Sequence, residues 1–257
     1  MELLYSNIIG EGEKKLIILH GFLGMGDNWK THAKNLAEKG YCVHLIDQRN
    51  HGRSFWSDNF SYQFMVEDLR AYTDHHKIAS AILLGHSMGG KTAMNFALKY
   101  SQLVEKLIIA DISPKYYAPH HQNILAGLAS LDFQVIRSRK GAEEQLSNYI
   151  SDFGIRQFLL KNLYWLKNGK LGMRINIGVL KNSGEAIGQA VFCDKVFDKP
   201  TLFMIGSNSN YVDKSNDNHM ITSYFLKTEM IEIKGAGHWL HAEQPKLFFD
   251  HLTSWIG

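Results

Sequence analysis

The sequence predicts an α/β domain in which a mostly parallel sheet is flanked by helices. Two observations indicate this class: short apolar runs alternate with longer amphipathic stretches, and several of the apolar runs lead directly into glycine-containing turns. Such an alternation is typical of parallel strands that are joined by helices. The 257 residues fit one domain with an insertion, and they suffice to bury a substantial core.

The apolar runs predict the strands, and the segments between them predict the helices. Buried strands are expected at residues 15–20, 41–47, 81–84, 104–111, 201–205 and 229–233, with an edge strand at 3–9. Helices are expected at residues 28–39, 62–77, 89–100 and 245–256. Gly40 closes the first helix and Pro245 opens the last, in agreement with the preferences of these residues at helix ends.

The alternation is interrupted between residues 114 and 195. This segment has no convincing core strand and is rich in aromatic and helix-forming residues. A structureless loop of that length would be unusual. We therefore expect a mostly helical cap, residues 114–195, inserted into a core made of residues 1–113 and 196–257. A cap at the carboxyl edge of a parallel sheet covers the crevice in which ligands bind.

Composition excludes several classes of function. The formal charge is only +3 and the basic residues are scattered, so no nucleic-acid partner is expected. No apolar run approaches the length of a membrane span, and no metal-ligand spacing or cofactor motif stands out. Cys42 and Cys193 cannot form a disulfide framework, and the N-terminus has no secretion signal, so we expect a cytoplasmic protein. Oligomeric state is not encoded in any visible pattern.

The segment GHSMGGKT at residues 85–92 fits two different motifs. Gly85-x-Ser87-x-Gly89 is typical of the sharp strand-to-helix turn that exposes a nucleophilic serine. The same segment fits the phosphate loop of nucleotide-binding proteins, which also lies between a strand and a helix. The run at 104–111 even ends in an aspartate, as the magnesium-binding strand of such proteins does. This motif alone leaves both hypotheses open.

Three other segments favour the serine hydrolase. They are HGFLG at residues 20–24, DQRNHGRS at 47–54 and GAGH at 235–238, and each directly follows a predicted strand. A phosphate-binding protein gives them no role, and the glycine order at 21–26 does not fit dinucleotide binding. A serine hydrolase uses all three, because parallel strands end at the edge that carries the nucleophile.

The predicted nucleophile is Ser87 and the predicted base is His238. A serine hydroxyl needs a base that takes its proton, and His238 follows the last core strand in a glycine-containing loop. The acid usually lies between them in the chain. Its common position, after the strand at 201–205, holds Ser209. Asp111, at the end of the strand before the cap, is therefore favoured as the acid, with Asp213 as the alternative.

The remaining site residues follow from the same architecture. The backbone N–H groups of Met88 and Phe22 are expected to form the oxyanion hole. Asp47, Arg49 and His51 are expected to brace the neighbouring loops.

Substrate contacts are predicted for Phe22, Leu23 and Trp165. The many aromatic residues of the cap, Trp165 among them, suggest an apolar acyl pocket, although such residues are more often simple packing.

Together, the segments HGFLG, DQRNHGRS, GHSMGGK and DISP (residues 111–114) resemble the α/β-hydrolase superfamily over nearly the whole chain. Within it, the chain is most similar to the small bacterial YbfF-like esterases. The resemblance implies a catalytic aspartate at position 111, a helical cap, and hydrolysis of short acyl esters or thioesters. We expect an esterase acting on short-to-medium acyl groups through an acyl-enzyme. A lyase or an acyltransferase with the same three residues remains the alternative.

Overall fold

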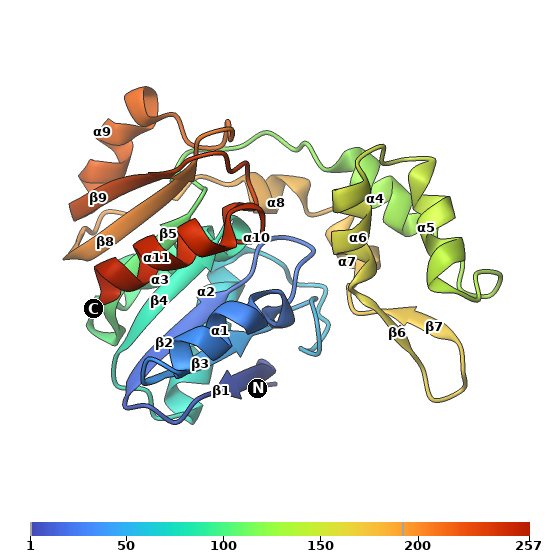
Figure 1. Cartoon of the computed structure of the whole chain (residues 1–257), viewed down its shortest axis with the longest axis horizontal. Coiled ribbons are helices and arrows are strands. Elements are labelled where there is room, and N and C mark those ends of the chain that lie inside the picture. Colours follow the sequence, from blue (N-terminus) through green and yellow to red (C-terminus); the bar gives the residue numbers. More distant parts are fainter. Residues whose placement is uncertain (1, 192) are drawn as a thin grey trace.

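The computed structural model describes residues 2–191 and 193–257. A twisted seven-stranded sheet runs through the molecule, with helices on both faces (Figure 1). Its strand order is β1-β3-β2-β4-β5-β8-β9, and β1 is antiparallel to β3, whereas the other pairs are parallel. The strands are β1 (Ser6–Ile9), β2 (Lys14–Leu19), β3 (Tyr41–Ile46), β4 (Ala81–His86), β5 (Val104–Ala110), β8 (Phe197–Gly206) and β9 (Phe225–Ile233). The predicted fold class is confirmed.

Helices cover the sheet on two sides. One apolar cluster packs α1 (Lys30–Ala37), α10 (Leu240–Glu243) and α11 (Pro245–Ile256) on one face, and a second packs α2 (Tyr62–His75), α3 (Met88–Lys99) and α9 (Lys214–Tyr224) on the other. Short 3-10 helices η1 (Gly26–Trp29) and η2 (Ser101–Leu103) complete the core. The sequence pattern did not predict α9, because its residues are mostly polar and Ile221 is its one buried apolar side chain.

Strand β2 explains why the central strands are continuous apolar runs. Leu16 and Ile18 point into the cluster under α1 and α11, whereas Ile17 and Leu19 point into the cluster under α2 and α3. A strand that is covered on both faces must be apolar at every position. Because these strands are parallel, their carboxyl ends meet at one edge of the sheet, and the candidate site lies at this edge.

The segment between β5 and β8 lies to one side of the sheet (Figure 1). It contains α4 (Gln122–Ala129), α5 (Arg139–Ser147), α6 (Phe153–Leu160), α7 (Ile177–Leu180), α8 (Gly184–Gly188) and the antiparallel pair β6 (Leu163–Trp165) and β7 (Leu171–Met173). These elements lie within residues 114–195, for which the sequence predicts a mostly helical cap, and we keep the name cap for this segment. Its helices form a third apolar cluster with Phe22, Tyr62 and Met88 of the core.

The β6–β7 hairpin is an addition to the mostly helical segment that the sequence predicted. Its signal is the Asn168-Gly169 pair between two short apolar runs, with Gly169 at φ 77°. Asparagine-glycine pairs are typical of hairpin turns because both residues tolerate positive φ. The runs are only three residues each, so the pattern was too short to be recognised as strands.

Candidate active site

Ser87 lies in a strained turn between β4 and α3. Its backbone has φ 53° and ψ −118°, a conformation that non-glycine residues rarely adopt. A Cβ atom on Gly85 would lie 2.3 Å from the carbonyl oxygen of Gly89, and one on Gly89 would lie 2.3 Å from that of Leu19. The turn therefore requires glycine on both sides of the serine, which explains the spacing of the motif.

The position of Lys91 does not fit the phosphate-loop hypothesis. In a phosphate loop this lysine would reach a nucleotide. Here it is 1% exposed, and its ammonium group donates hydrogen bonds to backbone carbonyls of the protein.

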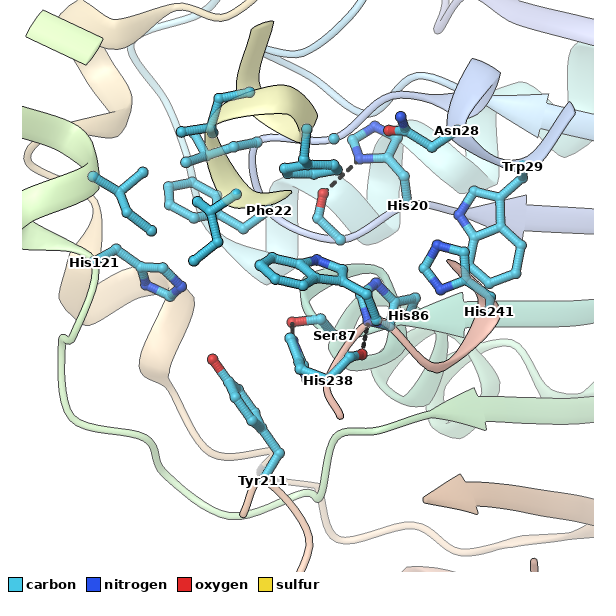
Figure 2. Close-up of a pocket in the computed structure, with 18 of the residues that line it drawn as sticks. His20, Phe22, Asn28, Trp29, His86, Ser87, His121, Tyr211, His238 and His241 are labelled. Atoms are coloured by element: carbon cyan, nitrogen blue, oxygen red, sulfur yellow. Dashed lines mark hydrogen bonds between the residues drawn. The ribbon is translucent and has the colours of Figure 1, made fainter. Parts of the chain in front are cut away.

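The structure brings Ser87, His238 and Asp111 together at the carboxyl edge of the sheet. The Nε2 atom of His238 lies 2.9 Å from Oγ of Ser87, and its Nδ1 atom lies 2.8 Å from Oδ2 of Asp111. Figure 2 shows Ser87 and His238 among the residues that line the adjoining cavity. With Asp111 ionised, Nδ1 of His238 donates to the carboxylate and Nε2 accepts from the serine hydroxyl.

The Asp111 carboxylate is held from three directions. Besides His238, it accepts from the backbone N–H of Gly206 at 3.0 Å and from the hydroxyl of Ser209 at 2.5 Å. The Asp111 side chain is buried, and its backbone has φ 52°, which directs the chain out of β5 into the cap. Ser209 holds the position at which the acid is common in this fold. Its hydroxyl contacts the carboxylate of Asp111, which directly follows β5.

Asp213 does not approach His238. It is exposed and forms the N-cap of α9, where its carboxylate accepts from the backbone N–H groups of Ser215 and Asn216. Such capping is the usual role of an aspartate at this position of a helix.

Two residues that the sequence did not identify support the His238 ring. Tyr211 stacks on it with ring centroids 3.7 Å apart and an interplanar angle of 13°. Figure 2 labels both residues in the lining of the cavity. His86 donates from Nε2 to the carbonyl oxygen of His238 at 2.8 Å. Burial and the neighbouring His238 lower the pKa of His86 to about 3, so His86 is neutral at physiological pH. Nothing in the local sequence around Tyr211 signals this contact.

The loop after β2 presents a free N–H group to the site. Within the described chain, neither Phe22 N–H nor Met88 N–H has a hydrogen-bond acceptor. Leu23, with φ 60°, donates to Nε2 of His51 at 3.2 Å, and its carbonyl oxygen accepts from the Asn162 side chain of the cap at 2.9 Å. The backbone N–H groups of Phe22 and Met88 therefore remain available for a substrate oxygen.

The predicted bracing residues stabilise this loop and the next one. His51 is buried, which lowers its pKa to about 3, and its neutral Nε2 is the acceptor for the Leu23 N–H. Asp47 accepts from the N–H groups of Gly26 and Arg53. Arg49 forms a bidentate pair with Asp68, with N–O distances of 2.5 and 2.7 Å.

A cavity of about 260 Å³ adjoins Ser87 and His238 (Figure 2). Its apolar lining side chains are Phe22, Leu23, Trp29, Ile124, Ile155, Phe158, Leu159 and Trp239. Among the described residues that line it, none is a lysine, arginine, aspartate or glutamate, and burial lowers the pKa of the lining His20, His86 and His121 to between about 3 and about 4. The cavity therefore offers a substrate a mostly apolar wall without a carboxylate, a lysine or an arginine among the described lining residues.

Of the three predicted substrate contacts, Phe22 and Leu23 line the cavity and Trp165 does not. Trp165 lies on β6 and is 61% exposed. Its hairpin departs from the cavity wall, whereas α6 supplies the cap's contribution through Ile155, Phe158 and Leu159. Helical spacing places these three α6 residues on one face of the helix. The aromatic content of the cap alone did not indicate this arrangement.

No group of histidine, cysteine, aspartate or glutamate residues suited to a metal ion occurs within residues 2–191 and 193–257. In the same part of the chain, every helix is too short or too polar to cross a bilayer.

Comparison with known proteins shows relatives along the whole chain. The family model of the alpha/beta hydrolase fold matches residues 14–245. The chain is 34% identical to the sn-1-specific diacylglycerol lipase ABHD11 of Mus musculus, over 100% of this chain and 85% of the lipase. It is 32% identical to the esterase YbfF of Escherichia coli K12, over 90% of this chain and 88% of the esterase. The solved structure of a marine microorganism esterase matches with a TM-score of 0.95 and 40% identity, over 99% of both chains.

These relatives confirm the predicted resemblance to the YbfF-like esterases, and their names agree with the predicted class of ester hydrolase. We conclude that this chain belongs to the α/β-hydrolase family.

Proposed function

We propose that this protein hydrolyses neutral carboxylic esters through an acyl-enzyme, with Ser87 as nucleophile, His238 as base and Asp111 as acid. The observation that carries the proposal is the continuous hydrogen-bond chain from Oγ of Ser87 through the His238 ring to Asp111, at 2.9 and 2.8 Å. The chain ends beside an apolar cavity that can hold an acyl or alcohol group.

In the first half of the reaction, Oγ of Ser87 attacks the ester carbonyl carbon while its proton passes to Nε2 of His238. The carbonyl π electrons move onto the oxygen, and the N–H groups of Phe22 and Met88 stabilise the resulting oxyanion. The carboxylate of Asp111 stabilises the imidazolium ion and maintains the ring orientation. Collapse of the intermediate breaks the bond to the alcohol, which leaves with the proton from His238.

In the second half, water attacks the acyl-enzyme and gives a proton to Nε2 of His238. The second tetrahedral intermediate collapses, the Ser87 oxygen takes that proton back, and the carboxylic acid leaves. An acyltransferase would follow the same path with an alcohol in place of this water, so the products distinguish the two reactions.

The cavity supports a substrate that is uncharged near the reacting carbon. An anionic acyl group would find no lysine or arginine among the lining residues described above and would lose its hydration on entry. An apolar chain instead gains about 0.8 kcal/mol for each buried CH₂ group. The mouse relative is named as a lipase for diacylglycerol, itself a neutral ester, and this agrees with the proposed substrate class.

The test is hydrolysis of p-nitrophenyl esters with acyl chains from acetate to decanoate, with a thioester series in parallel. Wild type is compared with Ser87→Ala, Asp111→Asn and Asp213→Asn. Loss of activity in the first two variants and retention in the third would support the proposed roles. Acid release without transfer to added alcohols supports a hydrolase rather than an acyltransferase. Absence of wild-type activity on every ester and thioester would refute the proposal.

A further inference from the structure

Lys91 is a buried lysine that the proposed reaction does not use. It lies on α3 one turn after the nucleophile, and its backbone N–H donates to the carbonyl oxygen of Ser87 at 3.0 Å. Its side chain is 1% exposed. The Nζ atom donates to the carbonyl oxygens of Pro114, at 3.2 Å, Lys115, and Gln189, at 2.7 Å. Three acceptors match the three donors of an ammonium group.

These carbonyls belong to the two connections between the core and the cap. The chain leaves the core after Asp111 and returns before β8, and two backbone hydrogen bonds join the outgoing and returning segments. The Tyr117 N–H donates to the carbonyl oxygen of Gly188 at 2.8 Å, and the Val191 N–H donates to that of Pro114 at 2.7 Å. We call residues 114–117 and 188–191 the cap hinge. The Lys91 side chain is thus hydrogen-bonded to both segments of the cap hinge.

The side chains around Lys91 have other partners, so its ammonium group bonds to the backbone carbonyls. The Lys115 side chain points to the carboxylate of Asp217, with an N–O distance of 2.8 Å. Tyr117 presents its ring to Lys91, with the centroid 5.2 Å from Nζ. The hydroxyl of Tyr117 donates to the carbonyl oxygen of Tyr211 at 2.6 Å, and Tyr211 stacks on His238. The cap hinge is therefore connected both to the nucleophile helix and to the ring of the proposed base.

We propose that Lys91 is a positioning residue that anchors the cap over Ser87 and thereby determines how well the enzyme binds long acyl substrates. This inference rests on the proposed esterase function. Removing the ammonium group leaves three buried carbonyls without their donor, which loosens the cap hinge. The core supplies Ser87, His238 and the oxyanion hole, whereas the cap supplies Ile124, Ile155, Phe158 and Leu159 to the cavity wall. A loosened hinge consequently affects long chains more than an acetyl group.

The test is Lys91→Met, which retains an unbranched side chain one atom shorter and removes the ammonium group. Amide hydrogen exchange at Tyr117 and Val191 is expected to become at least about tenfold faster, while exchange in β4 and β5 is unchanged. The ratio of kcat/KM for an octanoyl ester to that for an acetyl ester is expected to fall about tenfold, mainly through KM, which corresponds to about 1.4 kcal/mol. The matched control is Lys99→Met on the same helix, because Lys99 is exposed and pairs with Glu67.

Each outcome decides the proposal. A folded Lys91→Met protein with wild-type exchange at Tyr117 and Val191 overturns the anchor, and faster exchange with an unchanged substrate ratio overturns the role in substrate selection. The exchange measurement needs no substrate, so it stands apart from failure of the esterase proposal.

If Lys91→Met does not fold, NMR of the lysine ammonium groups in the wild-type protein replaces it. Burial and the Lys115 ammonium lower the pKa of Lys91 to about 7, so the spectrum is recorded at pH 6. A protected Lys91 resonance coupled to the carbonyl carbons of Pro114 and Gln189 is expected. Rapid exchange of every ammonium group with water would overturn the anchor.

Discussion

Replacing Asp111 with asparagine is expected to reverse the tautomer of His238. Oδ1 of Asp111 accepts from the Gly206 N–H, and Oδ2 accepts from both His238 and Ser209. An asparagine has one acceptor oxygen and one NH₂ donor. Placing the NH₂ toward Gly206 would bring two donors together in a buried site, at a cost of about 1–3 kcal/mol. The NH₂ group is therefore expected to face His238.

His238 must then accept at Nδ1 and carry its proton on Nε2, so it cannot take the proton from Ser87. The expected loss in kcat is about 10³–10⁴-fold, the size seen when a serine hydrolase base is held in the wrong tautomer. The assay is steady-state hydrolysis of p-nitrophenyl butyrate at pH 7.5, with the melting temperature as a check on folding.

The control is Asp213→Asn, which changes an exposed helix cap and is expected to leave kcat within about twofold of wild type. A folded Asp111→Asn protein with kcat within tenfold of wild type would refute this reasoning. Equal losses in both variants would also count against it, because the two carboxylates lie in unrelated environments.

Three further predictions concern the same region. Ser209→Ala removes a hydroxyl that shares Oδ2 of Asp111 with His238, so kcat for p-nitrophenyl butyrate should fall about 3- to 10-fold; an unchanged kcat would contradict this role. Phe158→Ala should lower kcat/KM for an octanoyl ester but not for acetate, whereas Trp165→Ala should alter neither, and an effect of Trp165→Ala alone would reverse this assignment of the cavity wall. His51 and His86 are buried, and their pKa is lowered to about 3, below the unfolded value near 6.5. The unfolded state therefore binds more protons, so the free energy of unfolding falls as the pH drops below about 6.5, by about 1.5 kcal/mol for each histidine between pH 6.5 and 5. A melting temperature that stays constant over this range would disprove the prediction.

Much of the fold was predictable because its signals are local. Central strands such as β2 contain continuous apolar runs, here residues 16–19, and the turn after β4 needs glycine at positions 85 and 89 for steric reasons. Helix α9 was missed because its stability comes from the Asp213 cap and from one buried isoleucine, and neither creates an amphipathic pattern. The β6–β7 hairpin was missed because its strands are shorter than the window in which alternation can be recognised.

The sequence by itself determined the family and the candidates Ser87 and His238, since each of these residues follows a recognisable strand within a short motif. Only the tertiary structure decided that Asp111 rather than Asp213 lies beside His238, that Ser209 and Tyr211 support this pair, and that Trp165 lies outside the cavity. Lys91 belongs to this second group, because its three partners lie 23, 24 and 98 residues away along the chain. The physical reason is that a strand end specifies where a residue lies on the sheet, whereas a hydrogen-bond partner depends on how separate loops pack against one another.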